Sequence, residues 1–163
     1  MNAFQHNGNP IGASRSQSRL LMVTSCGYLI PTIYSYLKCL PYYYTADYLL
    51  VALCSLNFWR DPRYCWRRTL DMIVAQGNFI GNGILIYLNG TKTPKVMYVL
   101  VVLAIINYGF AEYFFQRGKV GWVKSRQIWA KFHLAFHLTI ICAQMLMVNL
   151  LSKTLGGAKE CVL

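Results

Sequence analysis

The stretch WAKFHLAFHLTII, residues 129–141, decides the fold class, because it is an apolar run whose polar members recur with helical spacing. His133 and His137 lie four positions apart, which places both imidazoles on one face of a helix. The run belongs to an apolar segment over 129–152, which is long enough to cross the hydrocarbon core of a bilayer. The stretch therefore predicts a transmembrane helix that carries a polar face.

Apolar segments of this kind recur along the whole chain. Of its 163 residues 56% are hydrophobic and only five are acidic, which is too much apolar surface for one small water-soluble core. Candidate spans lie at 20–39, 40–59, 69–89, 95–115 and 129–152. We predict an all-α fold, a polytopic transmembrane helical bundle of about five spans. Pro31 interrupts the first segment, so a bundle of four spans stays open.

The same pattern predicts the domain organisation. Residues 1–19 are polar and lack the apolar core of a signal peptide, so we expect a polar N-terminal tail there. The transmembrane bundle should occupy 20–152, and a short C-terminal tail should follow over 153–163.

Basic residues favour one side of the predicted bundle, because those of the tail, of the loop after the second span and of the loop before the last span fall together. These residues are Arg15, Arg19, Arg60, Arg63, Arg67, Arg68, Arg117, Lys119, Lys124, Arg126 and Lys131. Lys and Arg in short loops are retained on the cytoplasmic side or its equivalent. We therefore predict a multipass integral membrane protein whose N-terminus is cytoplasmic.

The positive charge lies at the ends of predicted membrane helices, where it favours contact with lipid headgroups or partner subunits over direct nucleic-acid binding. The residues expected to make these contacts are Arg60, Arg63, Arg67, Arg68, Arg117, Lys119, Lys124 and Arg126. Aromatic residues at both ends of the spans predict interfacial belts. These are Tyr42, Tyr43, Tyr44 and Tyr48 at one end and Phe58, Trp59, Trp66, Trp122 and Trp129 at the other.

The six cysteines form no CxxC pair, and most lie within or beside apolar segments, which favours buried free thiols. Cys39 and Cys161 are both predicted on the outer side. A disulfide between them is the alternative if that side is oxidising.

Polar residues inside the spans are costly in hydrocarbon and therefore mark interior faces or sites. Asp71, Asn78 and Asn82 share one face of the third span, as do His133, His137 and Gln144 in the last. The topology places Ser55, Asp71, Glu112, His133 and His137 in one leaflet. They could form a divalent-metal site from His133, His137, Asp71 and Glu112. Alternatively the two His bind polar groups of neighbouring helices, and Asp71 pairs with Arg67 or Arg68.

The segment SLNFWRDPRYCWRRTLD, residues 55–71, followed by HLAFH at 133–137, resembles the CREST superfamily of membrane hydrolases and receptors. This superfamily includes alkaline ceramidases, hemolysin III proteins and adiponectin-type receptors. The resemblance implies catalytic roles for Ser55 and Asp71 and zinc binding by His133 and His137. The superfamily has a third zinc-binding His where this chain has Trp59, and it has seven spans.

Two functions from different classes follow from these observations. We expect a non-catalytic multipass subunit that anchors or stabilises a larger membrane-associated assembly, such as an organellar complex or a virion membrane or capsid. Its partners would be membrane lipids and other subunits, without a cofactor. The alternative is a zinc-dependent membrane hydrolase of lipid amides or esters. A transporter, with a path lined by Asp71, Asn78, Asn82, Glu112 and Gln144, is a third hypothesis.

Overall fold

The computed structural model of the chain describes residues 13–63, 65–119 and 123–155, with the side chains of 118, 119, 123 and 124 outside the description. Over these ranges the chain is almost entirely helical, which confirms the predicted all-α fold. The helices are α1 (Arg15–Cys26), α2 (Leu29–Leu37), α3 (Tyr42–Trp59), α4 (Trp66–Asn89), the short 3-10 helix η1 (Gly90–Lys92), α5 (Lys95–Lys119) and α6 (Val123–Thr154).

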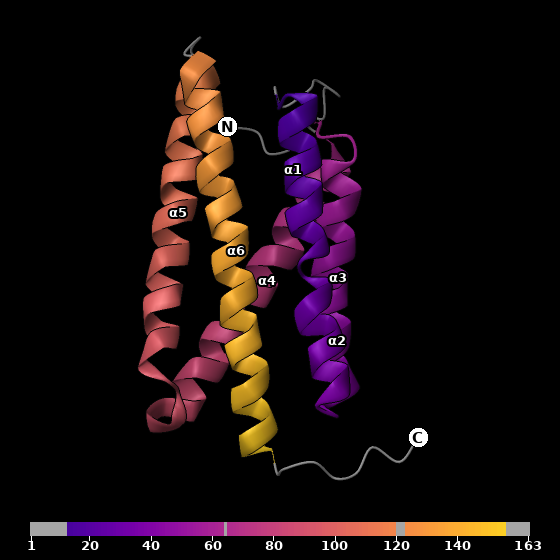
Figure 1. Cartoon of the computed structure of the whole chain (residues 1–163), viewed down its shortest axis with the longest axis vertical. Coiled ribbons are helices and arrows are strands. Elements are labelled where there is room, and N and C mark those ends of the chain that lie inside the picture. Colours follow the sequence, from indigo (N-terminus) through magenta and orange to yellow (C-terminus); the bar gives the residue numbers. More distant parts are fainter. Residues whose placement is uncertain (1–12, 64, 120–122, 156–163) are drawn as a thin grey trace.

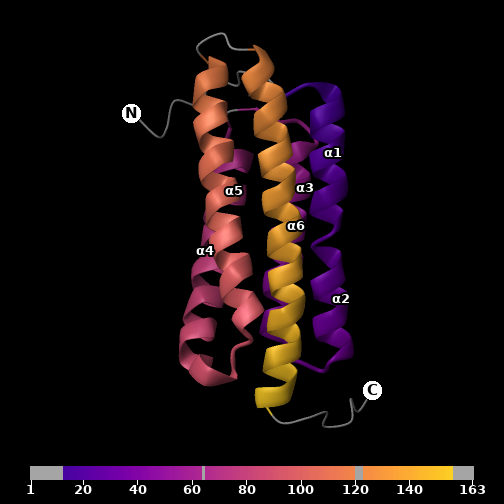
Figure 2. The same cartoon turned by 60° about the vertical axis from the view of Figure 1, so that its left-hand side comes forward.

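The chain runs back and forth along the long axis of the molecule. α1 and α2 are stacked end to end as the first pass, and α3, α4, α5 and α6 each make one further pass (Figure 1). α5 and α6 form the most extensive helix pair and lie side by side in both views (Figure 2). α1 and α2 pack against α3 and α6. The backbone of α4 packs mainly on α3, and α4 runs at a tilt to the other helices (Figure 1).

The first helix begins inside the segment predicted as a tail. Ser14 caps α1 by accepting a hydrogen bond from the Gln17 backbone N–H, and the Gln17 side chain accepts one from the Ser14 N–H at 2.9 Å. This reciprocal capping box satisfies two backbone donors at a helix start. The polar residues 14–19 therefore belong to α1, a difference from the predicted boundary that a capping motif explains.

The first pass is broken at Gly27 rather than at Pro31. Pro31 lies in the first turn of α2, where its missing N–H costs no helical hydrogen bond. Gly27 sits between α1 and α2 against α6, and an added Cβ would lie 2.7 Å from Ile141 Cδ1. The missing side chain at this point lets the backbone approach α6 closely.

Among the residues that the structure describes, three segments are long and apolar enough to cross a membrane, namely Arg15–Leu37, Lys95–Arg117 and Ser125–Thr154. α3 and α4 run alongside them but do not meet this criterion. α3 contains Asp47 and Asn57, and α4 begins with two arginines and carries Asn78 and Asn82. Three helices thus fit a membrane protein by composition, whereas the five predicted spans include two helices that do not meet this criterion.

Several aromatic residues predicted for the interfacial belts are buried in the bundle. Tyr48, Phe58, Trp59 and Trp129 all belong to the core, so the belt interpretation is wrong for them. Tyr42 and Trp66 are exposed, as a belt requires. These side chains are buried because they lie on the faces of α3 and α6 that pack against neighbouring helices.

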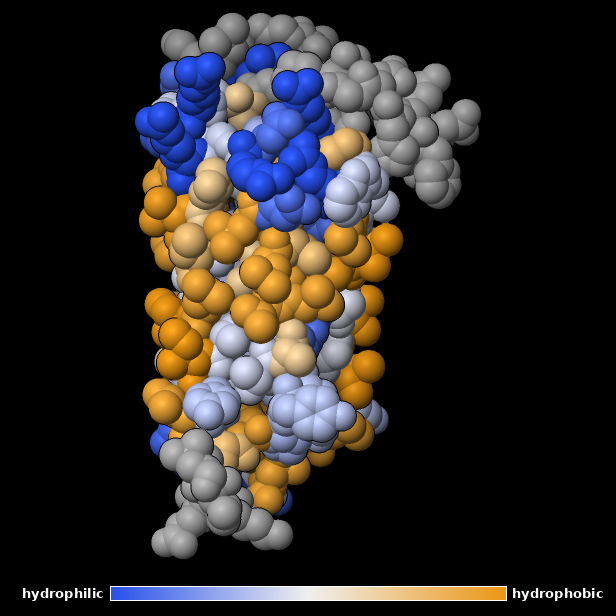
Figure 3. Space-filling view, turned by 90° about the vertical axis from the view of Figure 1, so that its right-hand side faces the viewer, coloured by the Kyte–Doolittle hydropathy of each residue, from blue (hydrophilic) through white to orange (hydrophobic). Residues whose placement is uncertain are grey.

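The predicted clustering of basic residues is seen along the long axis. The start of α1, the α3–α4 loop, the end of α5 and the start of α6 lie together at the end of the bundle that we call the basic end (Figures 1 and 2). Figure 3 shows hydrophilic residues there, above a broad apolar band. The side chains of Lys119 and Lys124 lie outside the described part, as does Trp122.

The cysteines differ in part from the predicted buried free thiols. Cys54 is free and buried, whereas the free Cys26 and Cys142 are exposed. Cys39, near the opposite end of the bundle, is disulfide-bonded. The predicted partner Cys161 lies outside the described residues.

Candidate functional site

A cavity of about 330 Å³, here called the central cavity, lies among α3, α4, α5 and α6. Ser55 of α3, Asp71 of α4, and His133 and His137 of α6 all line it. These are four of the five residues that the sequence places in one leaflet. The remaining walls are largely apolar and come mainly from α4 and α5. The central cavity is therefore an apolar space with polar groups gathered on one part of its wall.

His137 is held by a residue that sequence reasoning missed. Its Nδ1 lies 3.0 Å from Thr24 Oγ1, and the edge of Tyr28 packs against its ring. The sequence predicts only a polar group of a neighbouring helix as its partner, and Thr24 of α1 supplies it. No signal in the sequence singles out Thr24, because the packing of α1 on α6 is not a local property of either segment.

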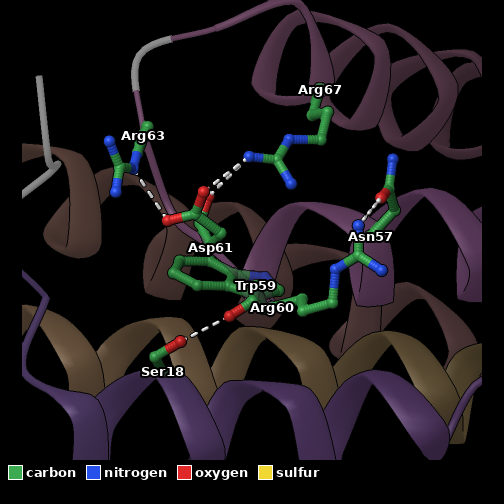
Figure 4. Close-up of polar contacts among 7 residues, drawn as sticks. All are labelled: Ser18, Asn57, Trp59, Arg60, Asp61, Arg63 and Arg67. Atoms are coloured by element: carbon green, nitrogen blue, oxygen red, sulfur yellow. Dashed lines mark hydrogen bonds and ion pairs between the residues drawn. The ribbon is translucent and has the colours of Figure 1, made fainter. Parts of the chain in front are cut away.

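His133 lies in a group of aromatic rings near the basic end. Its ring centroid is 5.2 Å from that of Trp59, 5.9 Å from that of Trp129 and 4.8 Å from that of His137. The backbone of Trp59 is also bound to α1, because its carbonyl oxygen accepts a hydrogen bond from Ser18 Oγ (Figure 4). We call Trp59, Trp129 and His133 the aromatic cluster.

Ser55 is also bound to the first pass of the chain. Its hydroxyl lies 3.0 Å from that of Ser25, and both residues are buried. Ser25 donates in turn to the Leu21 carbonyl of its own helix. A serine pair at the α1–α3 contact accounts for the polarity at position 55, which therefore serves packing between helices as well as lining the cavity.

One of the two predicted ion pairs of Asp71 is wrong. Arg67 Nη2 instead binds Asp61 Oδ2 at 2.9 Å, and Arg63 Nε binds Asp61 Oδ1 at 2.9 Å (Figure 4). The α3–α4 loop folds back over the start of α4 and brings Asp61 to Arg67. Hydrogen bonds from Arg63 and Arg67 hold the pKa of Asp61 below its ordinary value. The loop is thus ordered by a carboxylate between two guanidinium groups.

A smaller recess of about 80 Å³, the basic-end recess, lies next to the central cavity. Asp71, Met72, Tyr108 and His133 line both spaces. Glu112 lines only the recess and accepts a hydrogen bond from Gln116 of its own helix. Glu112 therefore lines the same recess as Asp71 and His133, as predicted, whereas His137 lines only the central cavity.

The basic-end recess also holds a buried donor. Trp59 is 2% exposed, and its indole Nε1 has no hydrogen-bond partner within the described parts of the chain. Arg68 lines the same recess. Such a buried N–H loses its hydration without gaining a replacement, which costs about 1–3 kcal/mol. The packing of the indole ring in the core must therefore offset this cost.

A network of polar side chains links α3, α4 and α6 further from the basic end. Asn78 Nδ2 donates to Asp47 Oδ2 at 2.6 Å, and Gln144 Nε2 donates to Asn78 Oδ1 at 2.9 Å. The carboxylate accepts only, so it fixes the orientation of both amides. Gln144 and Asn82 line a pocket of about 60 Å³. This network uses the polar faces that the sequence predicted, but its acceptor Asp47 was missed.

The residues of the site do not form the three-ligand zinc set that the CREST resemblance implies. Among residues 13–63, 65–119 and 123–155, no group of three or more His, Cys, Asp or Glu lies close enough to hold a metal ion. The third imidazole is replaced by the indole of Trp59, whose nitrogen is a hydrogen-bond donor and not a ligand. Glu112 binds Gln116, and the nitrogen Nδ1 of His137 faces Thr24.

The basic residues predicted to contact lipid or partners make several local contacts. Arg60 reaches Asn57 at 3.5 Å, and Arg117 Nε donates to Tyr113 Oη at 3.2 Å. The backbone carbonyl of Arg126 accepts from Gln17, which ties the start of α6 to α1. These contacts stay at the surface of the basic end and leave it strongly positive.

No protein-family model, curated protein or solved structure matches the chain.

Proposed function

We propose that the chain is a multipass integral membrane protein that binds a lipid-like ligand in the central cavity. The proposal includes five spans, with the basic end and the N-terminus on the cytoplasmic side. Its support is that every pass runs the length of the bundle and that basic residues gather at one end, as the retention of Lys and Arg in cytoplasmic loops requires.

The single observation that carries ligand binding is the mouth of the central cavity. Its wall includes Ile80 of α4 and Ile105 of α5, which are 61% and 55% exposed. In a bilayer both side chains would face hydrocarbon, because they lie midway along α4 and α5. A cavity that opens between apolar side chains and carries polar groups inside suits a ligand with an apolar chain and a small polar part.

Binding is favoured over hydrolysis by the donor set of the site. Hydrolysis of a lipid amide or ester by a metal-activated water needs a metal held by about three protein ligands. The indole of Trp59 does not supply the third one. The polar wall can nonetheless accept and donate hydrogen bonds, which is sufficient to orient a ligand.

The test is photocrosslinking in vesicles of phosphatidylcholine with a fatty-acyl probe that carries a diazirine. Ala75 lines the central cavity, and Ala75→Phe should place a ring in it and remove most of the crosslinking to α4 and α5. Ala46 is exposed on α3, and Ala46→Phe is the matched control that should crosslink like the wild type. Equal crosslinking of all three proteins would overturn the proposal.

A second candidate function is the non-catalytic subunit of a larger membrane assembly. The observation that favours it is the basic end, where Asp61 holds Arg63 and Arg67 side by side within a strongly basic surface. Purification in a mild detergent tests it, because an assembly subunit should elute with partners in fixed stoichiometry. Elution as a stable monomer, with the cavity ligand bound, would leave the first candidate alone.

A further inference from the structure

We infer that the ligand of the central cavity is an amphiphile with a protonated primary amine, and that Asp71 selects it by pairing with the ammonium group. This inference rests on the proposed ligand binding in the central cavity and names the chemical class of that ligand. Two properties of the cavity wall support it, namely the charge of its side chains and the direction of its hydrogen bonds.

The charge of the central cavity is opposite to that of the whole chain. The chain has a formal net charge of +11, yet among the residues that the structure describes Asp71 is the single charged side chain that lines the central cavity. Arg68 lines the basic-end recess next to it, where Glu112 adds a second carboxylate. Two carboxylates and one guanidinium leave an excess of negative charge around the two spaces. This excess favours a cationic head and disfavours an anionic one.

The hydrogen bonds of His137 fix which ring nitrogen can accept. Thr24 Oγ1 donates its single proton to the Leu21 carbonyl at 3.0 Å. Thr24 can therefore hydrogen-bond His137 at the same time only if Nδ1 of the imidazole is the donor. A neutral imidazole with its proton on Nδ1 has a lone pair on Nε2, so the other ring nitrogen of His137 is an acceptor.

Both acceptors can be reached from the central cavity. Nδ1 of His137 faces Thr24 of α1, and the ring lines the cavity. Within the described ranges Nε2 has no hydrogen-bond partner, and it is not one of the unpaired polar atoms that lie sealed in the interior. Asp71 is only partly buried and lines the same cavity. A ligand head in the cavity therefore meets a carboxylate and a neutral acceptor.

An ammonium group suits these acceptors better than a hydroxyl group. It has a positive charge and three N–H donors, which can pair with the carboxylate of Asp71 and with neutral acceptors such as Nε2 of His137. Tyr28, Gln76 and Tyr108 also line the cavity, and they can hydrogen-bond a neutral head as well as a charged one. The carboxylate is thus the group that distinguishes an amine from an alcohol.

The position of Asp71 suits the head of a membrane amphiphile. Asp71 lies in the second turn of α4, near the basic end, so the head would lie toward the cytoplasmic side of the bilayer. The apolar chain would leave through the mouth beside Ile80 and Ile105 into the hydrocarbon. A primary alkylamine has a pKa close to that of Lys, about 10.4, and is therefore charged at pH 7.

The experiment compares three competitors that share one chain, namely oleylamine, oleyl alcohol and oleyl sulfate, which are cationic, neutral and anionic. Each is added at increasing mole fraction to the phosphatidylcholine vesicles that hold the full chain and the diazirine-bearing fatty-acyl probe. The mole fraction that halves crosslinking to α4 and α5 is measured. Asp71→Asn removes the charge with little change of shape. Asp61→Asn is the matched control, because Asp61 lies in the α3–α4 loop and lines neither space.

On the wild type, oleylamine should halve crosslinking at a mole fraction at least about tenfold lower than oleyl alcohol, as expected for one hydrogen bond to a charged group. Oleyl sulfate should compete least. The positive charge of the whole chain would favour the sulfate, so this order cannot come from the overall charge. Asp71→Asn should bring oleylamine to the level of oleyl alcohol, and Asp61→Asn should keep the wild-type order. If Asp71→Asn does not fold, the order on the wild type still tests the inference.

Three results would overturn the choice of an amine by Asp71. The wild type could respond equally to oleylamine and oleyl alcohol, Asp71→Asn could keep the preference for oleylamine, or Asp61→Asn could lose that preference as fully as Asp71→Asn. In each case oleyl alcohol still competes, so ligand binding in the central cavity stands. If none of the three compounds reduces crosslinking on the wild type, the proposed function fails together with this inference.

Discussion

At the scale of single residues, the site is defined by hydrogen bonds that cross between helices. Thr24 binds His137 across α1 and α6, and Ser25 binds Ser55 across α1 and α3. The first pass of the chain therefore supplies partners for two of the four predicted residues that line the central cavity. Hydrogen bonds between membrane helices contribute modestly, about 0.6 kcal/mol on average and up to about 1.7 kcal/mol.

The contact of Thr24 with His137 gives a prediction about stability. Thr24→Val keeps the shape of the side chain but leaves Nδ1 of His137 without its partner, so we expect the free energy of unfolding to fall by about 1 kcal/mol. The measurement is reversible unfolding in detergent. Thr139→Val is the control, because the Thr139 hydroxyl binds a carbonyl of its own helix. Equal losses in both variants would contradict a special role for Thr24.

The ion pairs of Asp61 give a prediction about pH. The pKa of Asp61 is lower in the folded chain than in the unfolded chain, so its ion pairs stabilise the fold above the unfolded pKa of about 4. This contribution is lost as the pH falls through the folded pKa. Arg67→Gln should raise the pKa of Asp61, as carbon-13 NMR of the labelled carboxylate would show. Arg60→Gln should leave it unchanged, because Arg60 contacts Asn57 instead.

At the scale of the helices, the break between α1 and α2 sets how closely the first pass approaches α6. At Gly27 the backbone lies against Ile141, which is one turn of α6 beyond His137. The position of Thr24 relative to His137 depends on this approach, because both contacts lie within one turn of each other on α1. A small residue at position 27 therefore helps to keep Thr24 in contact with His137, although Gly27 does not line the central cavity.

We predict that Gly27→Ala lowers the free energy of unfolding by about 1–3 kcal/mol, because the new Cβ would overlap Ile141 Cδ1 and the Thr24 carbonyl. Gly77→Ala is the matched control on α4, where a Cβ meets open space. That substitution should stabilise the helix by about 0.5–1 kcal/mol. Thermal unfolding of the two variants in the same detergent measures both effects, and destabilisation by Gly77→Ala alone would refute the packing argument.

Sequence periodicity was sufficient for the helical fold and for one face of α6. It placed His133 and His137 together and gathered the basic residues at one end, because helical spacing and charge counts are local properties. The partners of these residues are not local. Asp47 and Asn78 are 31 positions apart, and the packing of α3 on α4 brings them together. Trp59 fits both a membrane interface and a core by sequence, and the orientation of α3 decides between them.

At the scale of the whole molecule, the number of passes predicts where each loop lies. With five spans, position 16 at the start of α1 and Cys65 at the start of α4 lie on one side of the membrane, and Thr91 of η1 lies on the other. A membrane-impermeant maleimide applied to sealed vesicles should therefore label Ser16→Cys and Cys65 from the same side and Thr91→Cys from the opposite side. Labelling of Ser16→Cys together with Thr91→Cys would instead show four spans.

The length of α6 bears on how this protein would sit in a bilayer. Its 32 residues extend about 48 Å at about 1.5 Å per residue, while a typical hydrocarbon core is about 30 Å thick. Its apolar part, residues 129–152, extends only about 36 Å. In a bilayer this part would fit the hydrocarbon core with a slight tilt. The first turns of α6, which carry Arg126 and Lys131, would then project beyond the core and reach the phosphate groups of the lipids.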